Sequence, residues 1–331
     1  MKILLFVYSI LIGSFLLYVY HFQAQTFPLN FSMNENKVQN EGRGDERYVF
    51  VTFQVGMDYW KGILKGAEDA AESLNIAIEY QGATKYDVNE QLIVLEEAIA
   101  KKPAGIALSA IHSEKLNDTI NKAVDSGIPV VLFDSDSPDS KAYAFLGTNN
   151  YQAGVTAAHK MAELLNNKGK VAIVTLPNQS NHIDRSTGFQ ETLKSEYPGI
   201  EIVEIKDGKG DQLVSRQAAI DILRSHEDLK GIFATEANGG AGLGDAVRYL
   251  NKDKEVKIIS FDTDKETLDM IKEGTISATI VQGTWNMGYW SLQHLFYLNN
   301  NAENSRFITK MNTDTGTSVV TKMNVDEFYA N

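Results

Sequence analysis

From about residue 47 onward, short apolar runs alternate with longer stretches in which apolar positions recur at helical spacing. The run at 127–136, GIPVVLFDSD, shows the pattern: a glycine and a proline precede apolar residues that are mostly β-branched or aromatic, and Asp134 follows them. A continuous apolar run of this kind fits a parallel strand that helices cover on both faces. The pattern therefore predicts an α/β fold with parallel sheets.

This alternation of strands and helices occurs twice. Besides the run at 127–136, the first set of predicted strands lies at 48–53, 76–81, 105–110 and 143–148. After a helix at 151–166, a second set lies at 170–175, 200–205, 231–235, 256–262 and 276–282. Such spacing predicts right-handed βαβ units and two parallel sheets. A helix at 285–298 and short strand-like pieces near Phe307 and Ser318 then indicate that the chain crosses back to the first unit.

The N-terminal segment is apolar from 3 to 20, about eighteen residues, which as a helix nearly matches the hydrocarbon thickness of a bilayer. Residues 1–22 are therefore predicted to be a signal anchor or a signal peptide, and both alternatives stay open. Residues 23–46 are polar and lack periodicity, which predicts a flexible linker with a reach of about 25–30 Å. An uncleaved anchor would hold an extracytoplasmic domain near the membrane, whereas cleavage would release a secreted or periplasmic protein.

Charge and cysteine content exclude several classes of function. The formal net charge of -12 argues against a nucleic-acid partner, because binding to phosphates needs a basic face. The sequence has no cysteine, which excludes thiolate nucleophiles, cysteine-ligated zinc and iron–sulfur clusters. It also excludes a lipid-modified cysteine as the membrane tether.

Polar and aromatic residues follow most of the predicted strands. Ligands of open α/β sheets bind just outside the carboxyl ends of the strands, so these side chains are expected to meet at one rim. The candidates are Tyr59, Trp60, Asp134, Arg185, Glu236, Asn238, Asp262 and Gln282.

This set of side chains suits a neutral, polyhydroxylated ligand. Ring C–H faces of such a ligand pack on Tyr59 and Trp60, and carboxylates, amides and one arginine hydrogen-bond its hydroxyls. Four or five hydrogen bonds to charged groups, each worth about 1.5–3 kcal/mol, less the entropy of closing two lobes, reach the ~8 kcal/mol of micromolar binding. Binding of this kind needs no covalent chemistry.

Enzyme motifs are absent from the sequence. It contains neither HExxH nor GxSxG, and the aspartates at 134/136 and 262/264 place only two carboxylates on each loop, so no catalytic residue, metal or cofactor is predicted. The run NGGAGLG at 238–244 lacks the third glycine of GxGxxG. It is interpreted as a close backbone approach with a helix N-terminus facing the cleft, the helix itself running from about Leu243.

Several motifs together resemble the type I periplasmic sugar-binding proteins, the ribose-binding-protein-like group, over about residues 47–325. They are DYWKGILKGA, GIPVVLFD, LGTNNYQAG, DRSTGF, GIFAT, ISFDTD and SATIVQG. The resemblance implies two Rossmann-like lobes joined by a three-strand hinge, the N-terminal lobe at 47–148 plus 283–309 and the C-terminal lobe at 149–282 plus 310–331. It also implies that Tyr59 and Trp60 sandwich a monosaccharide ring, whose hydroxyls bind to Asp134, Arg185, Asp262 and Gln282.

The chain departs from the ribose binders in several places. Ser135 replaces an arginine, Gly210 stands where they carry an aromatic residue, and TEANGGAG departs from the more usual TNDEMA-like loop, with Glu236 where relatives often have asparagine. Another pentose or a hexose is therefore as well supported as ribose. The resemblance implies a membrane partner, either an ABC permease or, as in the membrane-anchored xylose-sensing subgroup, a sensor histidine kinase ectodomain. A freely secreted or periplasmic protein that binds another small polar ligand, such as an autoinducer or a polyol, is the alternative.

Overall fold

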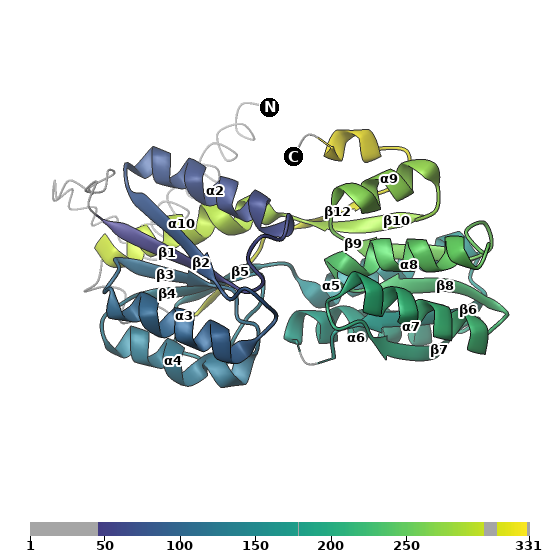
Figure 1. Cartoon of the computed structure of the whole chain (residues 1–331), viewed down its shortest axis with the longest axis horizontal. Helices are drawn as coiled ribbons and strands as arrows, with labels where there is room; N and C mark the ends of the chain where they lie inside the picture. The colour runs from purple at the N-terminus through teal and green to yellow at the C-terminus, as the bar shows by residue number, and fades with distance from the viewer. Residues whose placement is uncertain (1–45, 178, 301–309, 330–331) are drawn as a thin grey trace, which may run out of the picture. The chain divides into compact units, whose positions relative to one another are not determined.

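Two six-stranded sheets form the cores of two lobes in the computed structural model, which describes residues 46–177, 179–300 and 310–329 (Figure 1). The two-lobed α/β fold with parallel sheets that the alternating pattern predicts is confirmed. The elements of the first lobe, up to the first crossover, are β1 Arg47–Thr52, α2 Tyr59–Leu74, β2 Ala77–Gly82, α3 Val88–Ala100, β3 Gly105–Leu108, α4 Ser113–Asp125, β4 Val130–Phe133 and β5 Ala144–Gly147.

The second lobe continues the same alternation. Its elements are α5 Asn150–Leu165, β6 Gly169–Thr175, α6 Ser180–Glu196, β7 Ile200–Asp207, α7 Gln212–Ser225, β8 Leu229–Ala234, α8 Ala237–Tyr249, β9 Lys257–Phe261, α9 Lys265–Glu273 and β10 Ala278–Gln282. The last elements are α10 Thr284–Asn300, β11 Met311–Asp314, β12 Thr317–Val320 and the short 3-10 helix η1 Val325–Phe328.

The order of strands in the first sheet is β11-β5-β4-β3-β1-β2, and all of its pairs are parallel. The order in the second sheet is β12-β10-β9-β8-β6-β7, in which only β12 runs antiparallel to its neighbour. In the first sheet, Val51 of β1 pairs with Leu108 of β3, and Leu108 pairs with Leu132 of β4. This register brings the carboxyl ends of the three strands level, so the loops that follow them share one edge.

The strand β4 lies at the centre of the first lobe, and all four of its residues are fully buried. Helix α10 packs on one face of this sheet beside α2, and α3 and α4 cover the other face (Figure 1). The small residues of α2, such as Gly66 and Ala67, are buried and allow the close approach of α10. Burial on both faces explains why the run at 130–133 is apolar without alternation.

The chain crosses between the lobes three times: after β5, after β10 and between β11 and β12. The last crossover corrects the predicted boundary, which assigned all of 310–331 to the C-terminal lobe. Met311–Asp314 pairs with β5 in the first sheet, and only the following Thr317–Val320 joins the second. Two strands of four residues each carry too little periodicity to show which sheet they join.

Helix α8 begins at Ala237, whereas a start near Leu243 is expected from the sequence. The glycine-rich stretch therefore lies inside the helix rather than in a loop before it. The expected close backbone approach is present, since a Cβ atom at Gly242 would lie 2.5 Å from the Gln212 carbonyl oxygen of α7. Glycines lower helix propensity, but tertiary packing overrides propensity in α8.

Helix α6 likewise begins earlier than expected, at Ser180, five residues before the expected start.

The predicted membrane segment at 1–22 lies outside the described residues, and so does the predicted linker at 23–46 except for Glu46. Phe307, near which a strand-like piece is predicted, also lies outside them. In the part of the chain that the structure does describe, none of the helices has the length and apolar content needed to cross a bilayer.

Candidate functional site

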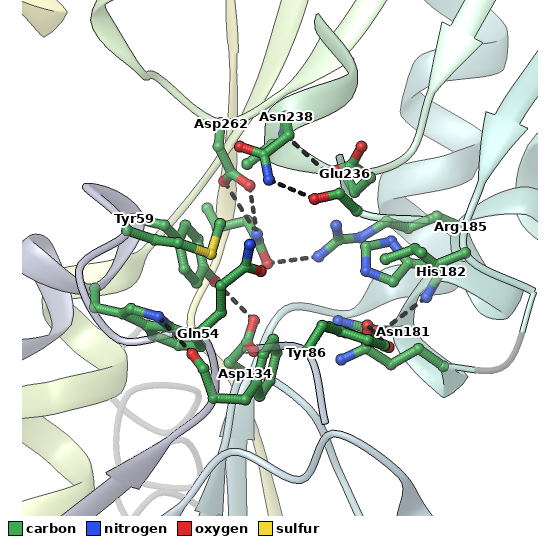
Figure 2. Close-up of a pocket in the computed structure, with 18 residues that line it drawn as sticks. Gln54, Tyr59, Tyr86, Asp134, Asn181, His182, Arg185, Glu236, Asn238 and Asp262 are labelled. Carbon is green, nitrogen blue, oxygen red and sulfur yellow. Dashed lines mark hydrogen bonds between the residues drawn. The ribbon is translucent and has the colours of Figure 1, made fainter. Parts of the chain in front are cut away.

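A cavity lies between the two lobes at the carboxyl ends of their strands (Figure 2). Its empty space is about 480 Å³, including the part open to solvent. All eight side chains proposed from the sequence line it. Further lining residues include Phe53, Gln54, Met57, Tyr86, Gln179, Asn181 and His182.

Two aspartates occupy matching positions in the two lobes. Asp134 follows β4 and is 4% exposed, and Asp262 follows β9 and is 7% exposed. Both have a left-handed backbone, with φ of 59° and 65°. This region is uncommon for residues other than glycine, although aspartate and asparagine enter it more readily than most. Unusual backbone conformations cluster at ligand sites, and here they occur at equivalent points of the two sheets.

The carboxylate of Asp134 is held within the first lobe. The Tyr59 hydroxyl donates to its Oδ1 over 2.7 Å, and the hydroxyl of Ser109, which follows β3, donates to its Oδ2 over 2.8 Å. Burial raises the pKa of Asp134 above its usual value, although both hydrogen bonds act in the opposite direction. Burial also raises the pKa of Tyr59 far above its usual value, so the phenol stays protonated and can donate.

Arg185, on α6, supplies the buried cation of the cavity and is held by three acceptors. Its Nε donates to Asn150 Oδ1 over 2.9 Å and its Nη1 to the Thr235 carbonyl over 2.8 Å. Its Nη2 donates to Gln282 Oε1 over 2.7 Å, and the guanidinium lies 3.9 Å from the centre of the Phe261 ring. These contacts fix the plane of the guanidinium before any ligand binds.

Gln282 connects Arg185 to Asp262. Its Oε1 accepts from Arg185, and its Nε2 donates to Asp262 Oδ1 over 3.0 Å. The Thr148 hydroxyl, at the first crossover, also donates to Gln282 Oε1 over 2.8 Å. The amide therefore orients the acid and the cation while it ties them to the hinge.

Two buried acids have strongly raised pKa values. Burial raises the pKa of Asp262 to about 7, against the opposing effect of Arg185. Burial also raises the pKa of Glu236 to about 7. Glu236 accepts from the Asn238 backbone N–H over 2.8 Å, and the Asn238 side chain donates to the Gly210 carbonyl over 2.8 Å. With one cation facing three buried acids, the cavity disfavours anionic ligands and favours a neutral ligand with many hydroxyl donors.

His182 also lines the cavity, beside Arg185. Its Nδ1 lies 2.9 Å from the Thr235 carbonyl oxygen. Burial, and secondarily the charge of Arg185, lower the pKa of His182 well below its usual value, so the imidazole is neutral. Among the described residues, no group of three or more histidine, cysteine or acidic side chains could hold a metal ion.

The expectation that Tyr59 and Trp60 sandwich a sugar ring is wrong in this form. Their rings contact each other edge to face, with centroids 5.0 Å apart and an interplanar angle of 70°, so no ring fits between them. Trp60 is 2% exposed and packs edge-on against Phe53 and Phe133 in the core. Consecutive helical residues point about 100° apart, so both cannot face one ligand as parallel walls.

The apolar wall comes from other residues of the first lobe. Phe53, Tyr59 and Tyr86 line the cavity there, and the Phe53 and Tyr86 rings meet edge-on at 5.5 Å. The sequence reasoning placed Gln179 in the polar stretch 178–185 at the rim without choosing it as a site residue, and it did not name Tyr86. Tyr86 lies in the loop that follows β2, so the rule that locates the other candidates could have found it.

The periplasmic binding protein domain family matches residues 48–302 of the chain. The fold is similar to that of AraP, an arabinose binding protein from Geobacillus stearothermophilus, with 60% identity, 86% of this chain and 99% of that chain covered, and a TM-score of 0.77. It is also similar to the sugar-binding protein of a sugar ABC transporter from Bacillus halodurans, with 58% identity and a TM-score of 0.81. That match covers 86% of this chain and 100% of the other. XylFII in the XylFII-LytSN complex is 31% identical, with 84% and 98% coverage and a TM-score of 0.77.

These relatives are solute-binding proteins and not enzymes. The match to residues 48–302 includes most of both lobes and all of the residues that line the cavity. The chain therefore belongs to the periplasmic binding protein domain family, as a member of its type I sugar-binding group.

Proposed function

We propose that the chain is an extracytoplasmic receptor that closes its two lobes on one neutral monosaccharide, with an aldopentose of the arabinose type as the first candidate. The observation that carries the proposal is the pairing of Asp134 in one lobe with Asp262 and Arg185 in the other around a single cavity. The choice of a pentose is supported by the 60% identity to an arabinose binding protein over 86% of this chain.

Each polar group of the cavity has a role in this proposal. Asp134 and Asp262 accept hydrogen bonds from hydroxyls on opposite sides of the sugar, and Arg185 donates to a ring or hydroxyl oxygen. Tyr59 offers its ring to the C–H face, while Glu236, Asn238 and Gln282 contact the remaining hydroxyls. A hydroxyl that donates to a carboxylate makes a strong, charge-assisted bond. Because the acids belong to different lobes, one ligand satisfies both only when the lobes are together.

Calorimetry on the purified full chain in detergent tests the proposal. The panel contains L-arabinose, D-xylose, D-ribose, D-glucose and D-galactose, with D-galacturonate as the anionic control and a polyol as the acyclic one. We expect micromolar binding of at least one pentose, weaker binding of the hexoses and none of the uronate. If no sugar binds more tightly than about 1 mM, the receptor proposal is wrong.

The second part of the proposal is a membrane partner that reads the closed form. Similarity to XylFII, whose solved complex contains LytSN, supports a sensor kinase ectodomain. Similarity to a sugar ABC transporter component supports a permease instead. The apolar segment at 3–20, if retained, would keep the receptor beside either partner. Affinity purification of the full chain from membranes, with and without the bound sugar, distinguishes them by whether a kinase or a permease is retained in a sugar-dependent way.

A further inference from the structure

A hydrogen bond between Tyr86 and Gln179 joins the two lobes at a distance from the hinge. Tyr86 lies in the loop between β2 and α3 of the first lobe, and Gln179 directly precedes α6 of the second. The Tyr86 hydroxyl donates to Gln179 Oε1 over 3.1 Å. Within residues 46–177, 179–300 and 310–329, the other side-chain hydrogen bonds that connect the lobes involve crossover residues, such as Asp314, which accepts from the Asn149 backbone N–H.

The position of Tyr86 is set by the first lobe. Its ring meets Phe53 edge-on, with an interplanar angle of 87°, so the hydroxyl projects toward the second lobe. Burial, and secondarily the nearby Asp207, raise the pKa of Tyr86 above its usual value. The hydroxyl therefore remains a hydrogen-bond donor at physiological pH.

Gln179 has a second polar atom, Nε2, whose hydrogen-bonding capacity is unused within the described part of the chain. The residue is 3% exposed and lines the cavity, and its Nε2 is buried without a hydrogen-bond partner among the described residues. A buried donor that lacks a partner is unfavourable, and an acceptor placed in the cavity relieves this penalty. Oxygen atoms of a polyhydroxylated ligand are such acceptors.

We propose that Tyr86 and Gln179 form a ligand-coupled latch: Gln179 donates through Nε2 to an oxygen of the bound ligand and accepts through Oε1 from Tyr86. One amide then connects the ligand, the second lobe and the first lobe. The inference rests on the proposed function, because it takes the ligand to be a sugar. Its consequence is that the ligand oxygen facing Gln179 controls how long the lobes remain closed, so sugars that differ at this oxygen differ mainly in dissociation rate.

Stopped-flow measurements on the full chain test the latch with the tightest-binding sugar of the panel. The variants are Tyr86→Phe, Gln179→Leu and the double variant. Tyr197→Phe is the matched control, since it removes a tyrosine hydroxyl that contacts His159 within the second lobe. We expect Tyr86→Phe to raise the dissociation rate about threefold to tenfold, the change that loss of one neutral hydrogen bond produces, with little effect on association.

Two further results are expected. Gln179→Leu should raise the dissociation rate more than Tyr86→Phe, because it removes both contacts of the amide. Adding Tyr86→Phe to Gln179→Leu should then change little, since the partner is already gone. If Tyr86→Phe has the same effect with and without Gln179, or no larger an effect than the control, the latch is wrong.

A sugar-free readout separates failure of the latch from failure of the receptor proposal. The chain has no cysteine, so Lys115→Cys on the first lobe and Gln217→Cys on the second accept a pair of fluorophores specifically. We expect Tyr86→Phe to shift the sugar-free protein toward larger distances between the lobes, and Tyr197→Phe to leave the distribution unchanged. If no sugar binds but the shift occurs, only the receptor proposal fails. Unchanged distances in Tyr86→Phe overturn the latch whatever the ligand is.

Discussion

The indole Nε1 of Trp60 donates a hydrogen bond to the carbonyl oxygen of Phe53 over 3.0 Å. This bond ties the first turn of α2 to the residue that follows β1. Trp60 therefore acts from the core, and it holds the turn on which the neighbouring Tyr59 faces the cavity. Its aromatic neighbours, Phe53 and Phe133, belong to the same lobe.

Trp60→Phe is expected to destabilise the protein more than it weakens sugar binding. The loss of buried volume and of the indole hydrogen bond should lower the free energy of unfolding by about 1–3 kcal/mol. Tyr59→Ala should weaken sugar binding more than it destabilises the protein, because it removes a side chain that lines the cavity and donates a hydrogen bond to Asp134. Thermal unfolding and calorimetry on both variants check this. A larger affinity loss for Trp60→Phe than for Tyr59→Ala would restore a direct role in ligand stacking.

Asp134→Asn and Asp262→Asn should each weaken sugar binding about tenfold to a hundredfold, since a hydrogen bond to a charged acceptor is worth about 1.5–3 kcal/mol. The matched control is Asp264→Asn, two residues after Asp262. Asp264 caps α9 by accepting from the Thr267 backbone N–H, and asparagine caps a helix equally well. Calorimetry should show an unchanged Kd for this control, and an equal loss in all three variants would contradict the assignment.

Stability of the sugar-free protein should fall as the pH rises from about 5 to about 7. The pKa values of Asp262 and Glu236 are raised to about 7, so the folded protein retains protons in this window that the unfolded chain has released. His182 opposes this trend. Its pKa is lowered in the folded protein, so below its usual pKa the imidazole gains a proton only when the chain unfolds, which destabilises the folded protein at the acidic end of the window. Because two acids lower the stability as the pH rises and one imidazole raises it, the net stability is expected to fall.

Melting temperatures of the wild type and Asp262→Asn at pH 5, 6 and 7 measure this dependence. The variant should show a smaller decrease, because it lacks one of the two acids. Half-buried carboxyls with lowered pKa values, such as Asp69, stabilise the folded protein throughout this window. Their contribution is lost only when the pH falls below their usual pKa, so they do not change the trend between pH 5 and pH 7. A melting temperature that rises steadily from pH 5 to pH 7 in the wild type would show that Asp262 and Glu236 are not protonated in the folded protein.

Gly288→Ala should lower the free energy of unfolding by about 1–3 kcal/mol through overpacking. Gly288 lies where α10 meets α2, and an added Cβ atom would overlap the carbonyl oxygen of Ile63. Gln293→Ala on the same helix is the control, and denaturant unfolding is the measurement. Equal stability of Gly288→Ala and the wild type would show that the two helices can separate without cost.

The fold was predictable from sequence because helices cover both faces of the sheets. That burial makes runs such as the one ending at Asp134 continuously apolar, and it makes the repeat of strand and helix visible. The same pattern located the candidate site, since ligands of open α/β sheets bind just outside the carboxyl ends of the strands, where these polar residues stand. The start of α8 could not be predicted, because its glycines are required by tertiary contacts and not by local preference: Gly242 meets α7, Gly240 meets β9 and α9, and Gly244 meets Met270 of α9.

The directions of the aromatic side chains and the partners across the cavity were not predictable from spacing. Tyr59 and Trp60 are adjacent in sequence, and only the packing against Phe53 decides which of them faces the ligand. The contact between Tyr86 and Gln179 joins residues of separate lobes, and it depends on how far the lobes are closed. Sequence periodicity carries no information on the direction of an aromatic side chain or on a contact between the lobes.

The order of β11 and β12 has a consequence for biosynthesis. These consecutive strands complete the edges of different sheets, so neither sheet is finished until nearly the whole chain has left the ribosome and been exported. A product truncated before Met311 would expose an unpaired edge on β5 and another on β10, and open edges template association with other chains. Incomplete synthesis of this receptor should therefore yield aggregates rather than a working half-protein.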